Sequence, residues 1–230
     1  MKTMKFVSLL AATALTLSMF AGCSLTGDKG DDTIKTSSVI STASADSSKD
    51  AAPSKYTVGA RTDKEFSSKF LGFNYKLPDG FAMSTDEEIK EMMDIGAEVV
   101  ESATDIEIDY NSMSNVYEMV ATSEYGDNVS IMTEKIPASY NETSYWESLS
   151  SQLKTMYADA VISETVETTT VAGMEFKAGT MNLTVSGVSM EQIYLFRNYN
   201  GRMCVIIITS VSEGARDSML AGFTPYAEIG

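Results

Sequence analysis

The side chain that performs most acid–base chemistry near neutral pH is missing, because the chain contains no histidine. Histidine is also the commonest metal ligand, and histidine-assisted serine or cysteine nucleophiles are excluded with it. One Ser-x-x-Lys pattern occurs, at Ser151 and Lys154. It lies in a segment with amphipathic helical spacing and therefore indicates a surface face of a helix. No glycine-rich phosphate loop is present.

Carboxylates are abundant, with 32 Asp and Glu residues against 17 Lys and Arg. No two of them stand out as an acid/base couple of the glycosidase kind. Like charges four residues apart destabilise a helix slightly, so an acidic helix face is either solvated or a docking face for a basic partner or for Ca²⁺. Five acidic residues share such a face: Glu87, Glu91, Asp94, Glu98 and Glu101. Three more alternate along a predicted edge strand: Asp105, Glu107 and Asp109.

The first 22 residues have the three parts of an export signal. Lys2 and Lys5 give a positive start, residues 6–20 form a largely apolar run, and two small residues follow. The run is too short to span a bilayer comfortably, since about 20 residues are needed. The signal is therefore excluded from the fold.

The end of this signal, Phe20-Ala21-Gly22-Cys23, resembles the lipobox of bacterial lipoproteins, whose usual form is Leu-Ala-Gly-Cys. The resemblance covers this segment alone, and Phe20 replaces the usual aliphatic residue. It implies that the thiol of Cys23 receives a diacylglyceryl group and that cleavage leaves Cys23 as the first residue. Two acyl chains hold a protein at a membrane far more durably than one. Cys23 is thus the predicted lipid-attachment site, at the extracytoplasmic face of the cell membrane.

The other cysteine, Cys204, lies in an apolar run, where a small buried core residue is expected. The chain therefore has no disulfide within its domain. This absence and the Ser/Thr-rich segment after Cys23 favour a Gram-positive-type cell. The 15 methionines are scattered through apolar stripes, which indicates core filling rather than metal binding.

The formal charge of −15 becomes −17 once Lys2 and Lys5 leave with the signal. Such a chain is repelled by nucleic acid, so no nucleic-acid partner is expected. Residues 23–55 are rich in Ser, Thr and Asp, contain no aromatic residue and predict a disordered tether. A tether of this length reaches roughly 30 Å. Residues 56–230 are the predicted single domain, a size suited to one core.

Hydrophobic periodicity and turn residues predict the elements of this domain. Capping boxes mark two helices, with Ser84–Glu87 or Thr85–Glu88 at the first and Ser144–Glu147 at the second. The predicted elements, in order, are a strand at 71–77, the acidic helix from 84, a strand at 105–110, a hairpin at 116–136, a helix at 144–157, a strand at 161–170, two hairpins over 175–211 and a helix at 212–221.

Tight turns between neighbouring strands make them antiparallel. The expected fold class is α+β, with a single antiparallel sheet flanked by helices. The opening Tyr75-Lys76-Leu77-Pro78-Asp79-Gly80-Phe81, the helix with Trp146 and the meander through Tyr199-Asn200-Gly201-Arg202 resemble the PsbP-like α/β/α sandwich over residues 68–226. This family includes photosystem extrinsic proteins and many bacterial lipoproteins. The resemblance implies the fold and transfers no functional residue.

These observations favour a non-catalytic bacterial cell-surface lipoprotein whose exported domain binds a protein or a ligand, with no cofactor. One alternative is a small-molecule or cation carrier with a pocket on the sheet. A second alternative is a carboxylate-based hydrolase, which needs a deep cleft holding two close carboxylates. The sequence selects no binding residue and no partner.

Overall fold

The computed structural model describes residues 55–93, 110 and 113–228. The predicted signal, Cys23 and all of the predicted tether except Lys55 lie outside the described residues. The strand expected at 105–110 also lies outside them, except for Tyr110. Every statement on the fold concerns the described part of the chain.

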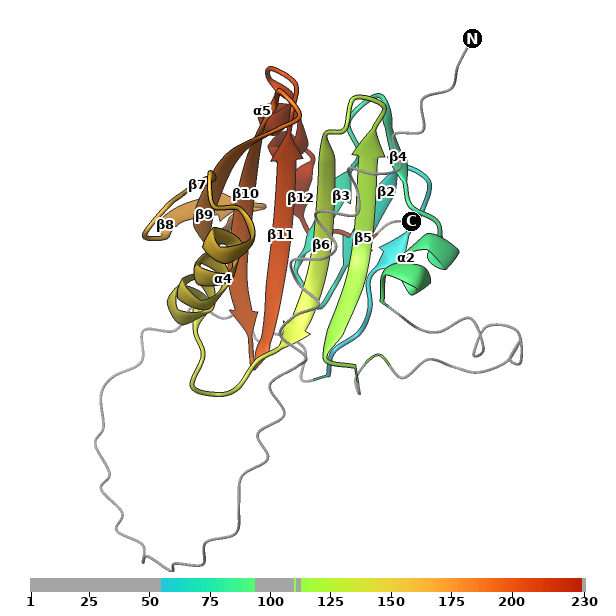
Figure 1. The fold of residues 1–230 in the computed structure, drawn as a ribbon. Coiled ribbons are helices and arrows are strands. Elements are labelled where there is room, and N and C mark those ends of the chain that lie inside the picture. Colours follow the sequence, from blue (N-terminus) through green and yellow to red (C-terminus); the bar gives the residue numbers. More distant parts are fainter. Residues whose placement is uncertain (1–54, 94–109, 111–112, 229–230) are drawn as a thin grey trace, which may run out of the picture.

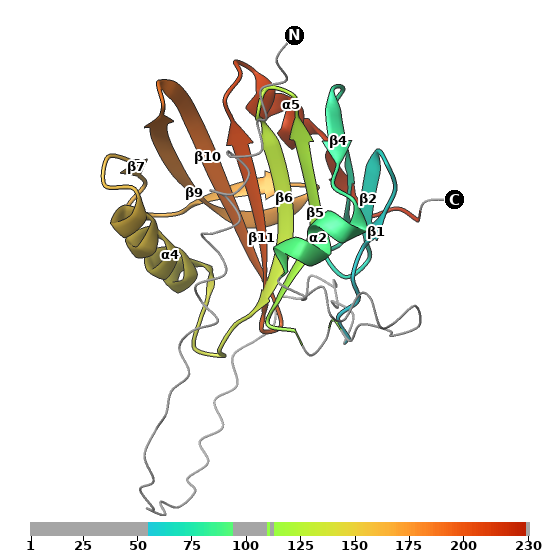
Figure 2. The ribbon, with the colours of Figure 1, turned by 45° about the vertical axis from the view of Figure 1, so that its right-hand side comes forward.

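Two antiparallel sheets form the domain (Figures 1 and 2), so the expectation of a single sheet was wrong. The smaller sheet has the order β1-β2-β3-β12, in which β3 pairs with β2 on one side and β12 on the other. These neighbours are too short to show a periodic pattern in the sequence. The strands of the smaller sheet are β1 (Ala60–Arg61), β2 (Glu65–Ser68), β3 (Phe73–Lys76) and β12 (Phe223–Pro225).

The larger sheet has eight strands in the order β4-β5-β6-β11-β10-β9-β7, with β8 also paired to β9. Its long strands are the three hairpin pairs that turn residues predict. The eight strands of the larger sheet are β4 (Phe81–Met83), β5 (Asn115–Ser123), β6 (Asn128–Lys135), β7 (Val161–Ile162), β8 (Glu167–Val171), β9 (Met174–Val185), β10 (Val188–Tyr199) and β11 (Arg202–Ser210).

The predicted strand at 161–170 is interrupted. Ile162 pairs with Met181 and Glu167 with Ala178, which leaves two extra residues between β7 and β8. Both pieces lie along the same edge of β9. The interruption breaks the hydrogen-bond ladder at this edge.

Two of the hairpin turns use backbone conformations that favour small or amide residues. Ser186 and Gly187 both have positive φ, 52° and 82°, and so do Asn200 and Gly201, 52° and 87°. Paired positive φ angles give a turn whose twist matches that of the flanking strands. These turns set the register of β9, β10 and β11.

The larger sheet has an apolar cluster on each of its two faces, and each face is therefore covered by another layer. Helix α4 (Glu142–Met156) covers one face of the larger sheet, and the smaller sheet packs on the other face (Figure 2). Trp146, Leu149 and Leu153 of α4 are buried, as the helical spacing predicts. A second core lies between the sheets, around Phe73 and Ile206.

The first helix begins at one of the two predicted capping boxes, whereas the other two described helices begin at residues other than those predicted. Helix α2 (Asp86–Met92) has the capping box of Thr85 with Glu88. Helix α4 begins two residues earlier than predicted, because Asn141 is its N-cap: the Asn141 side chain accepts from the Ser144 N–H, and the Ser144 hydroxyl accepts from the Asn141 N–H. The capping box of Ser144 with Glu147 was therefore wrong. Helix α5 (Ala215–Ala221) begins after Gly214 and ends at Gly222.

Candidate functional site

Few of the residues singled out in the sequence meet in one place. Cys23 lies outside the described residues, as do Asp94, Glu98 and Glu101 of the acidic face. Glu87 and Glu91 are exposed on α2. Their role therefore stays a hypothesis.

Other candidates are placed by the structure. Cys204 is completely buried, as predicted, and burial raises the pKa of its thiol well above the ordinary value. Ser151 and Lys154 are exposed on α4, as expected of a surface pattern. No group of three or more acidic or cysteine side chains among the described residues is placed to hold a metal ion.

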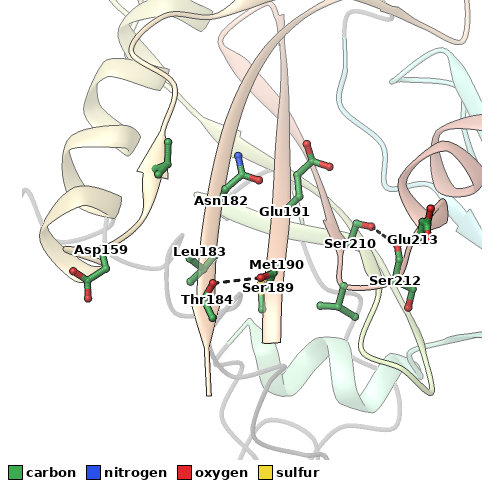
Figure 3. Close-up of a pocket in the computed structure, with 12 residues that line it drawn as sticks. Asp159, Asn182, Leu183, Thr184, Ser189, Met190, Glu191, Ser210, Ser212 and Glu213 are labelled. Carbon is green, nitrogen blue, oxygen red and sulfur yellow. Dashed lines mark hydrogen bonds between the residues drawn. The ribbon is translucent and has the colours of Figure 1, made fainter. Parts of the chain in front are cut away.

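Among the described residues, an open groove lies at the end of the β9–β10 hairpin, and we call it the hairpin groove (Figure 3). Its volume is about 640 Å³. The hairpin lies between Asp159, next to α4, and Glu213, next to α5 (Figure 3). The lining residues are Asp159, Val161, Asn182, Leu183, Thr184, Ser189, Met190, Glu191, Ser210, Val211, Ser212 and Glu213.

Strand register builds the groove. Val161 pairs with Asn182, Asn182 with Glu191, and Glu191 with Ser210. These four residues form one row across β7, β9, β10 and β11. Beyond this row β9 and β10 continue to the turn at 186–187 without β7 beside them. The groove is therefore a place where the edge strand stops before its neighbours do.

One wall of the groove is held by a carboxylate from a different hairpin. Asp127, in the turn between β5 and β6, accepts hydrogen bonds from the backbone N–H groups of Val211 and Ser212 at 2.8 and 3.0 Å. It also accepts from the Ser212 hydroxyl at 2.8 Å. Asp127 is only 3% exposed, so these bonds are protected from water. Helix α5 (Ala215–Ala221) starts later than its sequence pattern predicts because Gly214 has a φ of 74°, which lies outside the right-handed helical region.

The groove is acidic. Its lining has three carboxylates and no Lys or Arg. Glu191 is paired with Arg216 of α5, with nitrogen–oxygen distances of 3.3 and 3.4 Å. Asp159 and Glu213 are exposed and form no ion pair with any residue that the structure describes. The potential inside the groove is therefore negative.

The groove also exposes apolar side chains. Val161, which lines the groove, is 71% exposed. Leu183 is half-buried, and Met190 is buried with part of its surface in the groove.

A second hollow, of about 370 Å³, lies near the start of α4. It contains two cations, but each already has a partner. Lys177 donates to the Thr168 hydroxyl at 2.7 Å, and Arg197 donates to the carbonyl of Glu175 at 2.9 Å. This hollow is a weaker candidate for a binding site, because its Lys and Arg side chains already form hydrogen bonds within the domain.

Two further carboxylates are buried in the core, outside both hollows. Glu118 is fully buried and accepts hydrogen bonds from the Tyr56 hydroxyl at 2.6 Å and the Gly59 N–H at 2.7 Å. Burial raises the pKa of Glu118, against these hydrogen bonds and the nearby arginines. Glu134 accepts from the Tyr145 hydroxyl at 2.5 Å, and burial raises its pKa too.

The segment that carries Tyr56 lies at the opposite end of the larger sheet from the groove. We call residues Tyr56–Arg61 the strap. The guanidinium of Arg202, the first residue of β11, lies 4.0 Å from the centre of the Tyr56 ring. Ser210, the last residue of β11, lines the groove. Nine residues of strand separate the two ends by about 26 Å.

Sequence reasoning located none of the groove residues. Asn182, Glu191 and Ser210 are far apart in the chain and come together only through register. A weak signal existed, because the turn at Ser186-Gly187 has Thr184 and Ser189, two residues that line the groove, close to it on either side. Asp127 was recognised only as a turn residue.

Comparison with known proteins adds little beyond the fold. No family model matches the chain, and no curated protein matches it. Over the residues that it describes, the structure defines an α+β domain of two antiparallel sheets with three helices. Similar solved structures include cyanobacterial PsbP (CyanoP) from Synechocystis sp. PCC 6803, which is 10% identical, with 76% of this chain and 99% of CyanoP covered and a TM-score of 0.40.

Two more distant similarities were found. LpqN of Mycobacterium tuberculosis, described as involved in cell envelope biogenesis, is 6% identical, with 67% of this chain and 83% of LpqN covered and a TM-score of 0.39. A protein of Bacteroides thetaiotaomicron VPI-5482 is 12% identical, with 72% of this chain covered and a TM-score of 0.36. The match spans about half, 49%, of that protein. These scores transfer no site and no function.

Among the residues that the structure describes, none of the helices has the length and apolar character needed to cross a bilayer.

Proposed function

We propose that this chain is a non-catalytic lipoprotein of the bacterial cell surface, anchored through Cys23, whose exported domain binds a partner or ligand in the hairpin groove. In this proposal residues 1–22 are the signal and residues 23–55 the tether. The domain then belongs with the PsbP-like sandwiches. The missing histidine supports a binding role over acid–base catalysis.

The observation that carries the proposal is the opposite placement of the strap and the groove. The strap continues the segment that leads from Cys23, and it is fixed at the start of β11. The groove lies at the other end of β11. Helix α5 also lies at that end of β11 (Figure 1). Because the chain enters the domain at the strap end, the groove lies at the end of the larger sheet farther from the point of attachment. A tether of roughly 30 Å leaves room for a partner to approach.

The anchor is tested by membrane partitioning. Wild-type protein should fractionate with the membrane, and its processing should be blocked by globomycin. Cys23→Ala should be unprocessed at that site and should lose the lipid. Cys204→Ala is the matched control, because that thiol is buried and should leave partitioning unchanged. Equal lipid labelling of wild type and Cys23→Ala would remove the anchor from the proposal.

The binding role is tested by thermal shift. The purified lipoprotein is screened against Ca²⁺, polyamines, small metabolites and short peptides, since any ligand of the native state raises the melting temperature. Binding of one class should be weakened by substitutions in the groove. A screen in which no compound shifts the melting temperature counts against a binding role for this groove. Stabilisation by Ca²⁺ or a metabolite alone would favour the carrier alternative.

A further inference from the structure

Arg61, the last residue of the strap, joins the larger sheet to the start of helix α2. Its Nη1 atom donates to the backbone carbonyl of Glu118 at 2.6 Å. Its Nη2 atom pairs with the carboxylate of Asp86, the first residue of α2. The side chain of Arg61 is 18% exposed and that of Asp86 is 66% exposed. The sheet therefore holds the guanidinium, and the guanidinium holds the start of the helix.

The strap and α2 pack on opposite faces of the larger sheet. Tyr56 belongs to the apolar cluster between the two sheets, whereas Ile89 of α2 belongs to the cluster on the face that α4 covers. Strand β4 pairs only with residues 121–123 of β5, so none of the described strands lies beside Glu118 on that side. Arg61 bonds to β5 at this uncovered edge and thereby connects an element of one face with an element of the other.

The turn that follows the strap makes a second contact with the segment before α2. The Lys64 ammonium donates to the carbonyl of Phe81 at 3.1 Å. The Leu77 N–H donates to the Lys64 carbonyl at 2.9 Å. Phe81 begins β4, which ends three residues before α2 begins. The position of the segment that leads into α2 therefore depends on the strap and its turn.

Helix α2 depends on such contacts because it is short. A helix of seven residues is not stable in isolation, since it forms too few hydrogen bonds to offset the cost of nucleation. Its one buried residue is Ile89, and its capping box joins residues of its own first turn. Just before the helix, the Ser84 N–H donates to the carbonyl of Val120 at 2.8 Å. The ion pair with Arg61 is thus one of few described contacts that fix the helix start.

We propose that the strap is a latch for the acidic helix α2, with Arg61 as the connecting residue. While Tyr56 and Gly59 donate to the Glu118 carboxylate, Arg61 is held against β5 and fixes the start of α2. When the strap leaves Glu118, Arg61 leaves with it, and α2 loses this anchor. The exposed acidic face of the helix then changes its position on the domain.

The natural trigger is a load on the tether. The strap follows directly on the predicted tether, residues 23–55, so a pull on the tether reaches the strap before the rest of the domain. The latch goes beyond the proposed function, because it involves no residue of the hairpin groove. Its test reads neither ligand binding nor lipid attachment, and its failure would leave both parts of the proposed function standing.

The test is hydrogen exchange, measured by mass spectrometry on the full-length lipoprotein in a non-ionic detergent. Tyr56→Phe removes one bond of the strap and should quicken exchange in residues 56–61 about fivefold. Exchange in α2 should quicken about twofold, the scale of one exposed ion pair. Gly179→Ala is the control for general loss of stability, because Gly179 lies against Trp146 and far from the strap. It should leave local exchange in α2 at the wild-type rate.

A double-variant cycle tests the connection through Arg61. Asp86→Asn removes the ion pair at an exposed residue and leaves the bonds of the strap to Glu118 in place. In this background Tyr56→Phe should still quicken exchange in the strap but should have no further effect on α2. Glu87→Gln is the matched control, because it removes the same charge from the same turn of α2 without touching Arg61. In the Glu87→Gln background the effect of Tyr56→Phe on α2 should persist.

Three outcomes overturn the latch. Wild-type exchange in α2 of Tyr56→Phe would show that the helix does not respond to the strap. Additive effects of Tyr56→Phe and Asp86→Asn on α2 would show that Arg61 does not connect them. Equal acceleration of α2 by Tyr56→Phe and Gly179→Ala would show that the helix exchanges through global unfolding.

Discussion

The phenol of Tyr56 donates a 2.6 Å hydrogen bond to the carboxylate of Glu118, 62 residues further along the chain. The bond is buried, and the same carboxylate accepts from the Gly59 N–H. Arg61 reaches the backbone carbonyl of Glu118 and forms an ion pair with Asp86. The strap is thus fixed to the larger sheet at several points. A force on the tether would act on this cluster first.

Tyr56→Phe should destabilise the domain by about 1–3 kcal/mol, because the substitution removes a donor and leaves a buried carboxylate with fewer partners. The Thr133 hydroxyl, which lies 3.1 Å from the Tyr56 oxygen, loses a partner as well. Urea unfolding monitored by Trp146 fluorescence measures the change. Tyr125→Phe is the control, since Tyr125 is 72% exposed. Equal midpoints for the two variants would contradict the role given to Tyr56.

The raised pKa of Glu118 predicts how the stability of the domain depends on pH. Burial raises the pKa of this carboxyl in the folded state. The folded protein therefore holds the proton more tightly than the unfolded chain does. The contribution of Glu118 to stability is full below the ordinary carboxyl pKa and is lost as pH rises through the raised value.

Glu118→Gln removes this dependence. The free energy of unfolding of the variant minus that of wild type should increase as pH rises above about 4.5, because an ordinary carboxyl is ionised there in the unfolded wild-type chain. Glu134 has a raised pKa of its own, but it is present in both proteins and cancels in the difference. A difference that is flat between pH 4 and pH 8 would mean that Glu118 does not titrate differently on folding.

The indole of Trp146 lies directly against Gly179 in β9. A Cβ atom built on Gly179 would stand 2.5 Å from the Cε2 atom of Trp146, closer than real side chains approach. Gly179→Ala should destabilise by about 1–3 kcal/mol through overpacking. The double variant with Trp146→Phe tests the cause, because the smaller ring makes room. Additive effects in the double variant would place the cost elsewhere.

Asp127 positions one wall of the groove. Asp127→Ala leaves two backbone N–H groups and two hydroxyls, those of Ser212 and Ser123, without their acceptor, so the segment at 211–213 should loosen. Amide hydrogen exchange at Val211 and Ser212 should quicken. Asp79→Asn, in an exposed turn, is the control. Unchanged exchange at both amides in Asp127→Ala would contradict this positioning role.

Much of the larger sheet was predictable because its signals are local. Turn residues and alternation located β5, β6, β9, β10 and β11 within one or two residues. The smaller sheet was not predictable, because β1, β2 and β12 have two to four residues each and are defined by their pairing with β3. Glu118 was also not recognised. It lies at a register shift between Tyr117 and Met119, which strand periodicity does not anticipate.

The sequence by itself determined what depends on composition and short-range pattern. These features are the absence of histidine, the acidic charge, the three hairpins of the larger sheet and the burial of the Cys204 run. The lipid attachment at Cys23 stays a prediction from the same source. Tertiary structure decided everything that depends on register between distant segments. Asn182, Glu191 and Ser210 share a row only because antiparallel pairing brings their strands together. For the same reason Asp127 binds the backbone N–H groups of Val211 and Ser212, which are separated from it by 84 and 85 positions in the chain.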